Sequence, residues 1–154
     1  MKLYLVRHGE AVPEEADPSR PLTSRGSRDV RKVAAFLKSI SAGPISIFHS
    51  GKLRALQTAE IIAGSLGPGC QVQQAEDLSP GDPVRPWVEK INEETADLMI
   101  VGHLPFLGKL ASSLLTGSKS KNPLAFRPGG VVCLQRKEGR TWQVDWAVPP
   151  DILR

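Results

Sequence analysis

Aromatic side chains are scarce in this chain of 154 residues: phenylalanine, tryptophan and tyrosine together make up 5% of it. It therefore has little with which to stack nucleobases. It also has no run of five basic residues, and its net charge is only +4. These absences argue against nucleic acid as a partner, whereas a mild positive charge is compatible with an anionic substrate.

Cysteine is nearly absent, and membrane-length apolar runs are missing. The two cysteines, Cys70 and Cys133, are far apart and fit no metal-binding spacing. Cys133 lies in an apolar run at 131–134, so we expect a buried thiol, and nothing supports a disulfide. The chain begins directly with a strand-like pattern, without the features of a signal peptide or a membrane span. We therefore expect a cytoplasmic protein with no membrane partner.

Short runs that suit strands recur along the chain. Four of them, each followed by a helix or a turn, lie at 3–6, 45–48, 71–74 and 98–101, and two more at 131–135 and 142–147 flank a turn at 137–140. Uninterrupted apolar runs such as the first are typical of strands that are covered on both faces.

Amphipathic stretches separate these runs. The first begins near Thr23 or Ser24, the candidate N-caps, has an apolar stripe that ends at Ile40, and stops at Gly43-Pro44. Three more stripes with helical spacing lie at 55–66, 84–91 and 106–115. Strands that alternate with helices and end in a hairpin predict one α/β domain, residues 1–154, with a largely parallel sheet.

Polar residues of compatible chemistry follow three of the expected strands. Arg7 and His8 end the first strand, and His103 follows the fourth. His49-Ser50 closes the second strand, and Arg54 lies in the first turn of the next helix. Because parallel strands end at one edge of a sheet, where open α/β folds bind ligands, we expect two arginines and two histidines to converge there.

These residue types suit phosphoryl transfer. Guanidinium groups match phosphate oxygens, so Arg7, Arg54 and a protonated His103 would stabilise the transferring group. A neutral His8 would attack phosphorus and form a phosphohistidine. Its other ring nitrogen would need an acceptor such as a backbone carbonyl to fix the tautomer, and Gly9 would let the chain turn beneath the anion.

Each of these residues alone also has an ordinary structural interpretation. Arg7 and His8 fit a solvated turn, and Arg54 fits a surface charge on an amphipathic helix. His103, before Leu104-Pro105, fits a helix cap or a hydrogen-bonded core histidine. Only the joint pattern favours a functional site.

Four motifs carry a family resemblance. They are VRHGEA at 6–11, RPLT at 20–23 with Gly26, SGKLRALQTA at 50–59, and GHLP at 102–105. In this order and spacing, over residues 3 to about 115, the chain resembles the histidine phosphatase superfamily. More narrowly, it is similar to the small SixA-type phosphohistidine phosphatases, and its short length agrees because larger relatives carry inserted lids.

The resemblance implies roles for the two arginines and two histidines that we expect to converge. His8 would be the phosphate acceptor, and Arg7, Arg54 and His103 would form the phosphate pocket. A three-layer α/β/α sandwich of the phosphoglycerate mutase-like type is implied too, with no metal and no cofactor. One position departs from the family, since Gly51 follows Ser50 where Ser-Pro is usual. That departure affects the stiffness of the local backbone.

The proton donor is the least determined part of the site. Larger relatives use a carboxylate in the loop after the third strand, and Asp77 occupies the matching place, with Glu76, Glu10 and Asp17 as rivals. A departing imidazole needs a strong acid less than a departing alcohol does.

Two further cations lie near the motifs. Arg20 either contacts the substrate or forms a salt bridge within its loop. Lys52 either adds positive charge to the pocket or is a solvated surface lysine.

We expect a monomeric phosphatase that acts through phospho-His8 on phosphohistidine in a protein, since a pocket without a lid would admit a protein side chain. One alternative is a small-molecule phosphomonoesterase or a mutase, although a mutase needs an enclosed site. Another is a non-catalytic phosphate-binding module, although binding alone would not require His8. A nucleic-acid binder is the least favoured interpretation.

Overall fold

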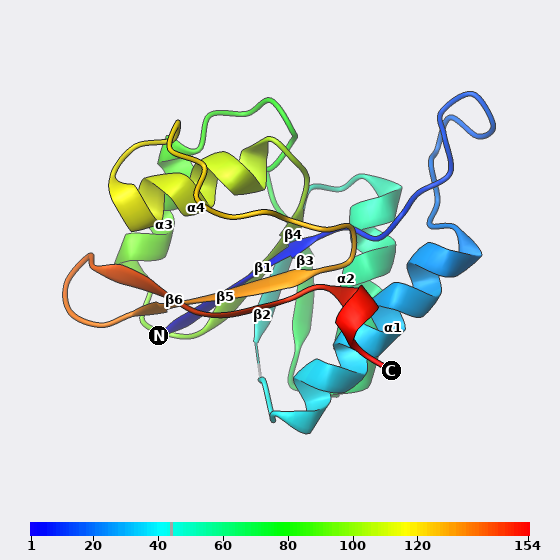
Figure 1. Cartoon of the computed structure of the whole chain (residues 1–154), viewed down its shortest axis with the longest axis horizontal. Coiled ribbons are helices and arrows are strands. Elements are labelled where there is room, and N and C mark those ends of the chain that lie inside the picture. Colours follow the sequence, from blue (N-terminus) through cyan, green and yellow to red (C-terminus); the bar gives the residue numbers. More distant parts are fainter. Residues whose placement is uncertain (44) are drawn as a thin grey trace.

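A six-stranded sheet forms the middle layer of the computed structural model, which describes residues 1–43 and 45–154 (Figure 1). The strands are β1 (Lys2–Arg7), β2 (Ser46–His49), β3 (Gln71–Gln74), β4 (Leu98–Gly102), β5 (Val131–Arg136) and β6 (Trp142–Val148), in the order β3-β2-β4-β1-β5-β6. β1 to β4 run parallel to one another, whereas β5 pairs antiparallel with β1 and with β6. The predicted parallel sheet with a C-terminal hairpin is confirmed.

Helices cover both faces of this sheet. They are α1 (Ser24–Ser39) and α2 (Leu53–Leu66) on one face, α3 (Arg85–Glu93) and α4 (Phe106–Thr116) on the other, and the short 3-10 helix η1 (Pro150–Ile152) beside α1 (Figure 1). Alternate side chains of β1 point to opposite layers. Leu3 and Leu5 pack with α3 and α4, whereas Tyr4 and Val6 pack with α1 and α2. The chain is therefore a three-layer α/β/α sandwich.

The first helix begins as predicted and ends earlier than predicted. Thr23 is the N-cap, and its hydroxyl accepts a hydrogen bond from the Gly26 N–H at 2.9 Å. α1 ends at Ser39, and the next residue, Ile40, is its C-cap. Ile40 is 43% exposed, so the apolar stripe that α1 buries ends at Leu37 and not at Ile40 as predicted, because the helix itself ends before Ile40. Pro44, expected to end this helix together with Gly43, lies outside the described residues.

Two smaller sequence expectations can also be compared with the structure. Cys133 is fully buried in the core, and both Cys70 and Cys133 are free thiols, as expected. Across the described residues, no helix combines the length and the apolar character that crossing a membrane requires.

Candidate active site

The three strands that carry the candidate residues are neighbours in the sheet. β4 lies between β1 and β2, and all three are parallel, with Arg7 paired to Gly102 and His49 paired to Val101. Their carboxyl ends therefore lie side by side. The segments that follow them bring His8 and His103 together, and the two imidazole rings lie 5.0 Å apart between centroids.

His8 is held as a neutral imidazole with one nitrogen free. Its Nδ1 lies 2.7 Å from the carbonyl oxygen of Gly9, the kind of acceptor that the sequence analysis expected. A carbonyl only accepts, so Nδ1 carries the proton and Nε2 keeps a lone pair. Burial, together with the charges of Arg54 and Arg7, lowers the pKa of His8 to about 4, although the hydrogen bond to Gly9 opposes this shift. At neutral pH the His8 ring is therefore uncharged, and its Nε2 carries no proton.

The two arginines present buried donors with nothing to bind. The Nε atoms of Arg7 and Arg54 are buried and have no hydrogen-bond partner among the described residues. Arg7 is oriented by its Nη1, which donates to the carbonyl oxygen of Phe126 at 2.9 Å. Burial lowers the pKa of both guanidinium groups from its ordinary value. Buried cationic donors without partners are costly, and an anion would satisfy them.

His103 is almost completely buried and neutral. It is 1% exposed, and its Nε2 lies 2.6 Å from the hydroxyl oxygen of Ser50. Its Nδ1 has no partner in the part of the chain that the structure describes. Burial lowers the pKa of His103 to about 3, with further lowering by His8 and by nearby cations, Arg54 first. His103 is therefore neutral in the free pocket, where no anion offsets the burial and the positive charges, and a protonated His103 beside a bound phosphoryl group stays a prediction.

Arg20 and Lys52 lie close enough to act on the pocket electrostatically. Arg20 is fixed by its Nε, which donates to the carbonyl oxygen of Val12 at 3.1 Å, and its charge lowers the pKa of both His8 and His103. It forms no salt bridge with any described residue, so that alternative for Arg20 is wrong. Lys52 is exposed at the N-cap of α2, and its charge also lowers the pKa of His103.

Of the four carboxylates that are candidate proton donors, two accept hydrogen bonds from described residues and two do not. Glu10 accepts a hydrogen bond from the Thr23 hydroxyl at 2.8 Å. Asp17 accepts two from Ser19, which lower the pKa of this carboxyl. Asp77 and Glu76 are exposed in the loop after β3, and neither carboxylate makes a hydrogen bond or ion pair with a described residue. No contact joins Asp77 to the two histidines.

Gly51 adopts a backbone conformation that proline cannot adopt. Its φ is +91°, whereas proline is fixed near −65°. Its N–H also donates to Nδ1 of His49 at 3.1 Å, and proline has no such donor. The departure from Ser-Pro therefore changes the local conformation, which is more than the change in stiffness that the sequence suggested.

Three residues of the site have roles that sequence analysis did not assign. Ser50 and Thr58 belong to the quoted motif, but nothing in the sequence indicates that Ser50 contacts His103 or that Thr58 braces the loop of His8. Phe126 contributes only a backbone carbonyl, 119 residues from Arg7, and no side-chain signal marks such a group.

Known proteins are similar to this chain over much or all of its length. A family model described as the histidine phosphatase superfamily (branch 1) matches residues 3–80. The chain belongs to this superfamily. The phosphohistidine phosphatase SixA of Escherichia coli is 28% identical to it over 159 residues, which covers 100% of this chain and 97% of that protein. An uncharacterised protein of Picosynechococcus is 34% identical, over 91% of this chain and 88% of its own length.

A structural comparison extends the similarity to the whole fold. The structure of the protein histidine phosphatase SixA complexed with tungstate matches this one with a TM-score of 0.88 and 26% identity, and covers 100% of both chains. Within residues 1–43 and 45–154, no three His, Cys, Asp or Glu side chains are grouped as metal ligands would be. Arginine and histidine side chains make up the candidate site of this histidine phosphatase.

Thr58 joins the loop of His8 to the helix that carries Arg54. The buried Thr58 hydroxyl accepts from the Gly9 N–H at 3.1 Å and donates to the Arg54 carbonyl oxygen at 2.8 Å. Thr58→Val should lower the free energy of unfolding by about 1–3 kcal/mol, because it leaves a buried N–H without a partner. It should also reduce kcat. Urea unfolding and steady-state kinetics test both. Thr58→Ser retains the hydroxyl as the matched control, and an equal loss in Thr58→Ser would contradict the bracing role.

The two buried histidines should make the fold sensitive to acid. Both are neutral in the folded state down to about pH 4, whereas an unfolded histidine takes up a proton near pH 6.5. Their contribution to stability is therefore complete above pH 6.5 and is lost as the pH falls toward 4, by up to about 1.4 kcal/mol per pH unit for each histidine. Urea unfolding at pH 7 and pH 5 measures the loss. His8→Gln should show a smaller loss than the unsubstituted protein, and an equal loss would contradict the shifted pKa of His8.

Proposed function

We propose that this protein is a phosphohistidine phosphatase that transfers the phosphoryl group to His8 and then to water. The observation that carries the proposal is the set of three buried nitrogens without partners, on Arg7, Arg54 and His103, beside an imidazole whose Nε2 is free. Such a set suits a doubly charged phosphoryl group next to a nucleophile, and a neutral ligand would not satisfy it.

The reaction follows from these groups. Arg7 and Arg54 hold the phosphoryl oxygens while Nε2 of His8 attacks phosphorus; the phosphorus bond to the leaving group breaks, and its electron pair leaves with the departing nitrogen. The bound dianion favours the charged form of His103, so its pKa rises when substrate binds. Water then attacks the phosphorus of phospho-His8, the electron pair of the broken bond returns to Nε2, and inorganic phosphate is released.

Two observations support phosphohistidine in a protein as the substrate. The E. coli relative over the whole chain is named a phosphohistidine phosphatase, at 28% identity. The segments that follow β2 and β4 are also short, three residues each before the next helix begins. These two segments are too short to form a lid, which supports a site that accepts a side chain on another protein.

Asp77 is the proton donor that we propose for poor leaving groups. Its carboxylate has no partner among the described residues, whereas Glu10 and Asp17 are already hydrogen-bonded. Asp77 protonates the departing atom and takes a proton back from the attacking water. Asp77→Asn should therefore lower kcat about 10²-fold for an alkyl phosphate. It should change kcat little for p-nitrophenyl phosphate, whose leaving group needs no proton.

The control for this prediction is the adjacent exposed carboxylate. Glu76→Gln makes the same chemical change one residue away and should leave kcat unchanged for both esters. If Asp77→Asn slows the two esters equally or not at all, Asp77 is not the donor.

A substrate panel tests the proposed function itself. A protein phosphorylated on histidine, free phosphohistidine and a set of small phosphate esters are incubated with the enzyme, and released phosphate is measured at neutral pH. We expect the highest kcat/KM for phosphohistidine in the protein. Higher values for a small ester would favour a phosphomonoesterase, and phosphate binding without turnover of any substrate would favour a binding module.

A further inference from the structure

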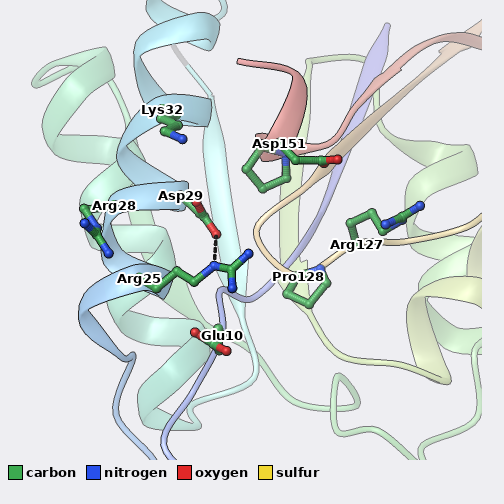
Figure 2. A pocket seen from close by; sticks show the side chains of 9 residues that line it. Glu10, Arg25, Arg28, Asp29, Lys32, Arg127, Pro128 and Asp151 are labelled. Carbon is green, nitrogen blue, oxygen red and sulfur yellow. Dashed lines mark ion pairs between the residues drawn. The ribbon is translucent and has the colours of Figure 1, made fainter. Parts of the chain in front are cut away.

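A groove lies beside the phosphate pocket, and the proposed reaction does not use it. It has a volume of about 700 Å³ and runs between α1 and the segments that precede β5 and follow β6. Figure 2 shows Arg25 reaching from α1 into the groove toward Pro128, with Glu10 at one end and Lys32 and Asp151 at the other.

The groove is rigidly connected to the nucleophile. Glu10, in its lining, follows His8 by two residues, and α1 packs on it so closely that a Cβ on Gly26 would lie 2.1 Å from the Glu10 carbonyl oxygen. On the other wall, the Gly129 N–H donates to the carbonyl oxygens of Arg7 and His8, at 2.9 and 3.1 Å. A ligand in the groove is therefore held in a fixed position relative to His8.

The helix that forms one wall concentrates the positive charge of the protein. α1 carries five basic side chains and one acidic one, which gives +4, the same as the net charge of the whole chain. Arg25 and Arg28 lie near its N-terminus, where the helix dipole makes cations unfavourable, and its first turn has no acidic residue. The helix dipole therefore does not account for their placement, and only Arg25 has an ion pair within the helix, with Asp29.

Most of the cations in the groove are available to a partner. Arg25 has one ion pair, with Asp29 at 4.0 Å, and its side chain is 75% exposed. Arg28, Lys32 and Arg127 form no ion pair with any described residue. Of the three carboxylates in the lining, Asp29 is paired with Arg25, Glu10 is hydrogen-bonded to the Thr23 hydroxyl, and Asp151 is exposed at the far end.

We propose that this groove binds an acidic segment of the substrate protein, next to the phosphohistidine that enters the pocket. The inference rests on the proposed function and specifies which phosphoproteins the enzyme prefers. Carboxylates of the partner pair with the cations of α1 and of the segment before β5. These contacts increase the rate of encounter and fix the register of the phosphohistidine over His8.

Peptides of opposite charge test the groove. Two phosphohistidine peptides are compared, one flanked by Asp and Glu and the other by Lys, with free phosphohistidine as the substrate that cannot reach the groove. The unsubstituted enzyme should prefer the acidic peptide about tenfold in kcat/KM at low salt, a difference of about 1.4 kcal/mol. The preference should appear in KM and should shrink at high ionic strength.

Charge reversal on α1 locates the effect. Arg25 and Lys32 lie seven residues apart, on the same face of α1, and both line the groove. The double variant Arg25→Glu/Lys32→Glu should abolish the preference and leave the hydrolysis of free phosphohistidine unchanged. Arg31→Glu/Lys38→Glu is the matched control, because it makes the same change in net charge with the same spacing, and both residues are exposed on this helix without lining the groove. Circular dichroism checks that the variants remain folded.

The outcomes separate this inference from the proposed function. If free phosphohistidine is cleaved and Arg25→Glu/Lys32→Glu keeps the preference, or Arg31→Glu/Lys38→Glu loses it equally, the groove does not bind the acidic segment, and the proposed function stands. If the unsubstituted enzyme cleaves no form of phosphohistidine, the proposed function fails and this inference fails with it.

Discussion

Replacing His8 with alanine should reduce kcat by at least about 10³-fold for every phosphate substrate, because it removes the atom that we propose as the acceptor of the phosphoryl group. The remaining arginines would still bind phosphate, but no group in the pocket could replace Nε2 as the nucleophile. His103 is the nearest imidazole, and its Nε2 is already bonded to Ser50 at 2.6 Å. Steady-state hydrolysis of p-nitrophenyl phosphate and of phosphohistidine measures the loss.

The fold should survive this substitution. Among the described residues, the His8 side chain makes one hydrogen bond, to the carbonyl oxygen of Gly9 within its own loop. His49→Ala is the comparison, since His49 ends β2, which β4 separates from β1, and its Nδ1 accepts the Gly51 N–H. That variant should retain most of its kcat. A His8→Ala enzyme with more than about a tenth of the original activity would contradict the role of His8 as the nucleophile.

Replacing Arg54 with alanine should lower kcat/KM by about 10²–10⁴-fold, and the protein should become no less stable. The loss follows from the role of Arg54 as a cation that faces the transferring group. The stability follows from its surroundings, because its buried Nε has no partner among the described residues. Removing a partly buried cation whose Nε has no such partner relieves a cost of folding. A variant that merely misfolds would lose both activity and Tm. A loss of activity with an unchanged or higher Tm would therefore point to a direct role in the reaction.

Inhibition by tungstate provides a second readout for Arg54. A relative with the same fold binds tungstate in its solved structure, and a tetrahedral oxyanion resembles the phosphoryl group in charge and shape. Arg54→Ala should weaken this inhibition, and Arg54→Lys should restore only part of it, because lysine keeps the charge without the planar fork. If Arg54→Ala keeps kcat/KM within about threefold and is inhibited as before, Arg54 does not bind the phosphoryl group.

The arrangement of the sheet was accessible from the sequence, because its signals are local and strong. The apolar runs at 3–6 and 98–101 are short and uninterrupted, and in the structure their residues are almost completely buried. Parallel strands end at one edge, so the position of His8 and His103 beyond these runs was sufficient to place them together. The helix that begins after Thr23 was equally clear, since a hydroxyl at the N-cap satisfies a free backbone N–H.

The electrostatic state of the site was not accessible in the same way. The pKa of His103 depends on its burial and on the charges of Arg54, Lys52 and Arg20, which the fold brings together from separate segments. The brace from Arg7 to the carbonyl of Phe126 joins residues 119 positions apart and involves no side chain of the second residue. Neither feature has a periodicity or a motif in the sequence.

The backbone conformation at Gly51 is a further feature that the sequence did not predict. A glycine in place of proline indicates a more flexible loop, but it does not indicate the sign of φ. In the structure φ is +91°, and the side chain of Gln74 lies so close that a Cβ on Gly51 would be 2.5 Å from its amide nitrogen. The contact comes from the neighbouring strand β3 and depends on the register of β2 with β3.

The central claim is that His8 carries the phosphoryl group during turnover. Its most direct test is rapid mixing with substrate, quenching without acid, and mass spectrometry of the intact and digested protein. The account predicts an adduct of one phosphoryl group on the peptide that contains His8, formed within the first turnover and absent from His8→Ala. Release of phosphate by the unsubstituted enzyme with no adduct on His8, or with the adduct on another residue, would contradict it.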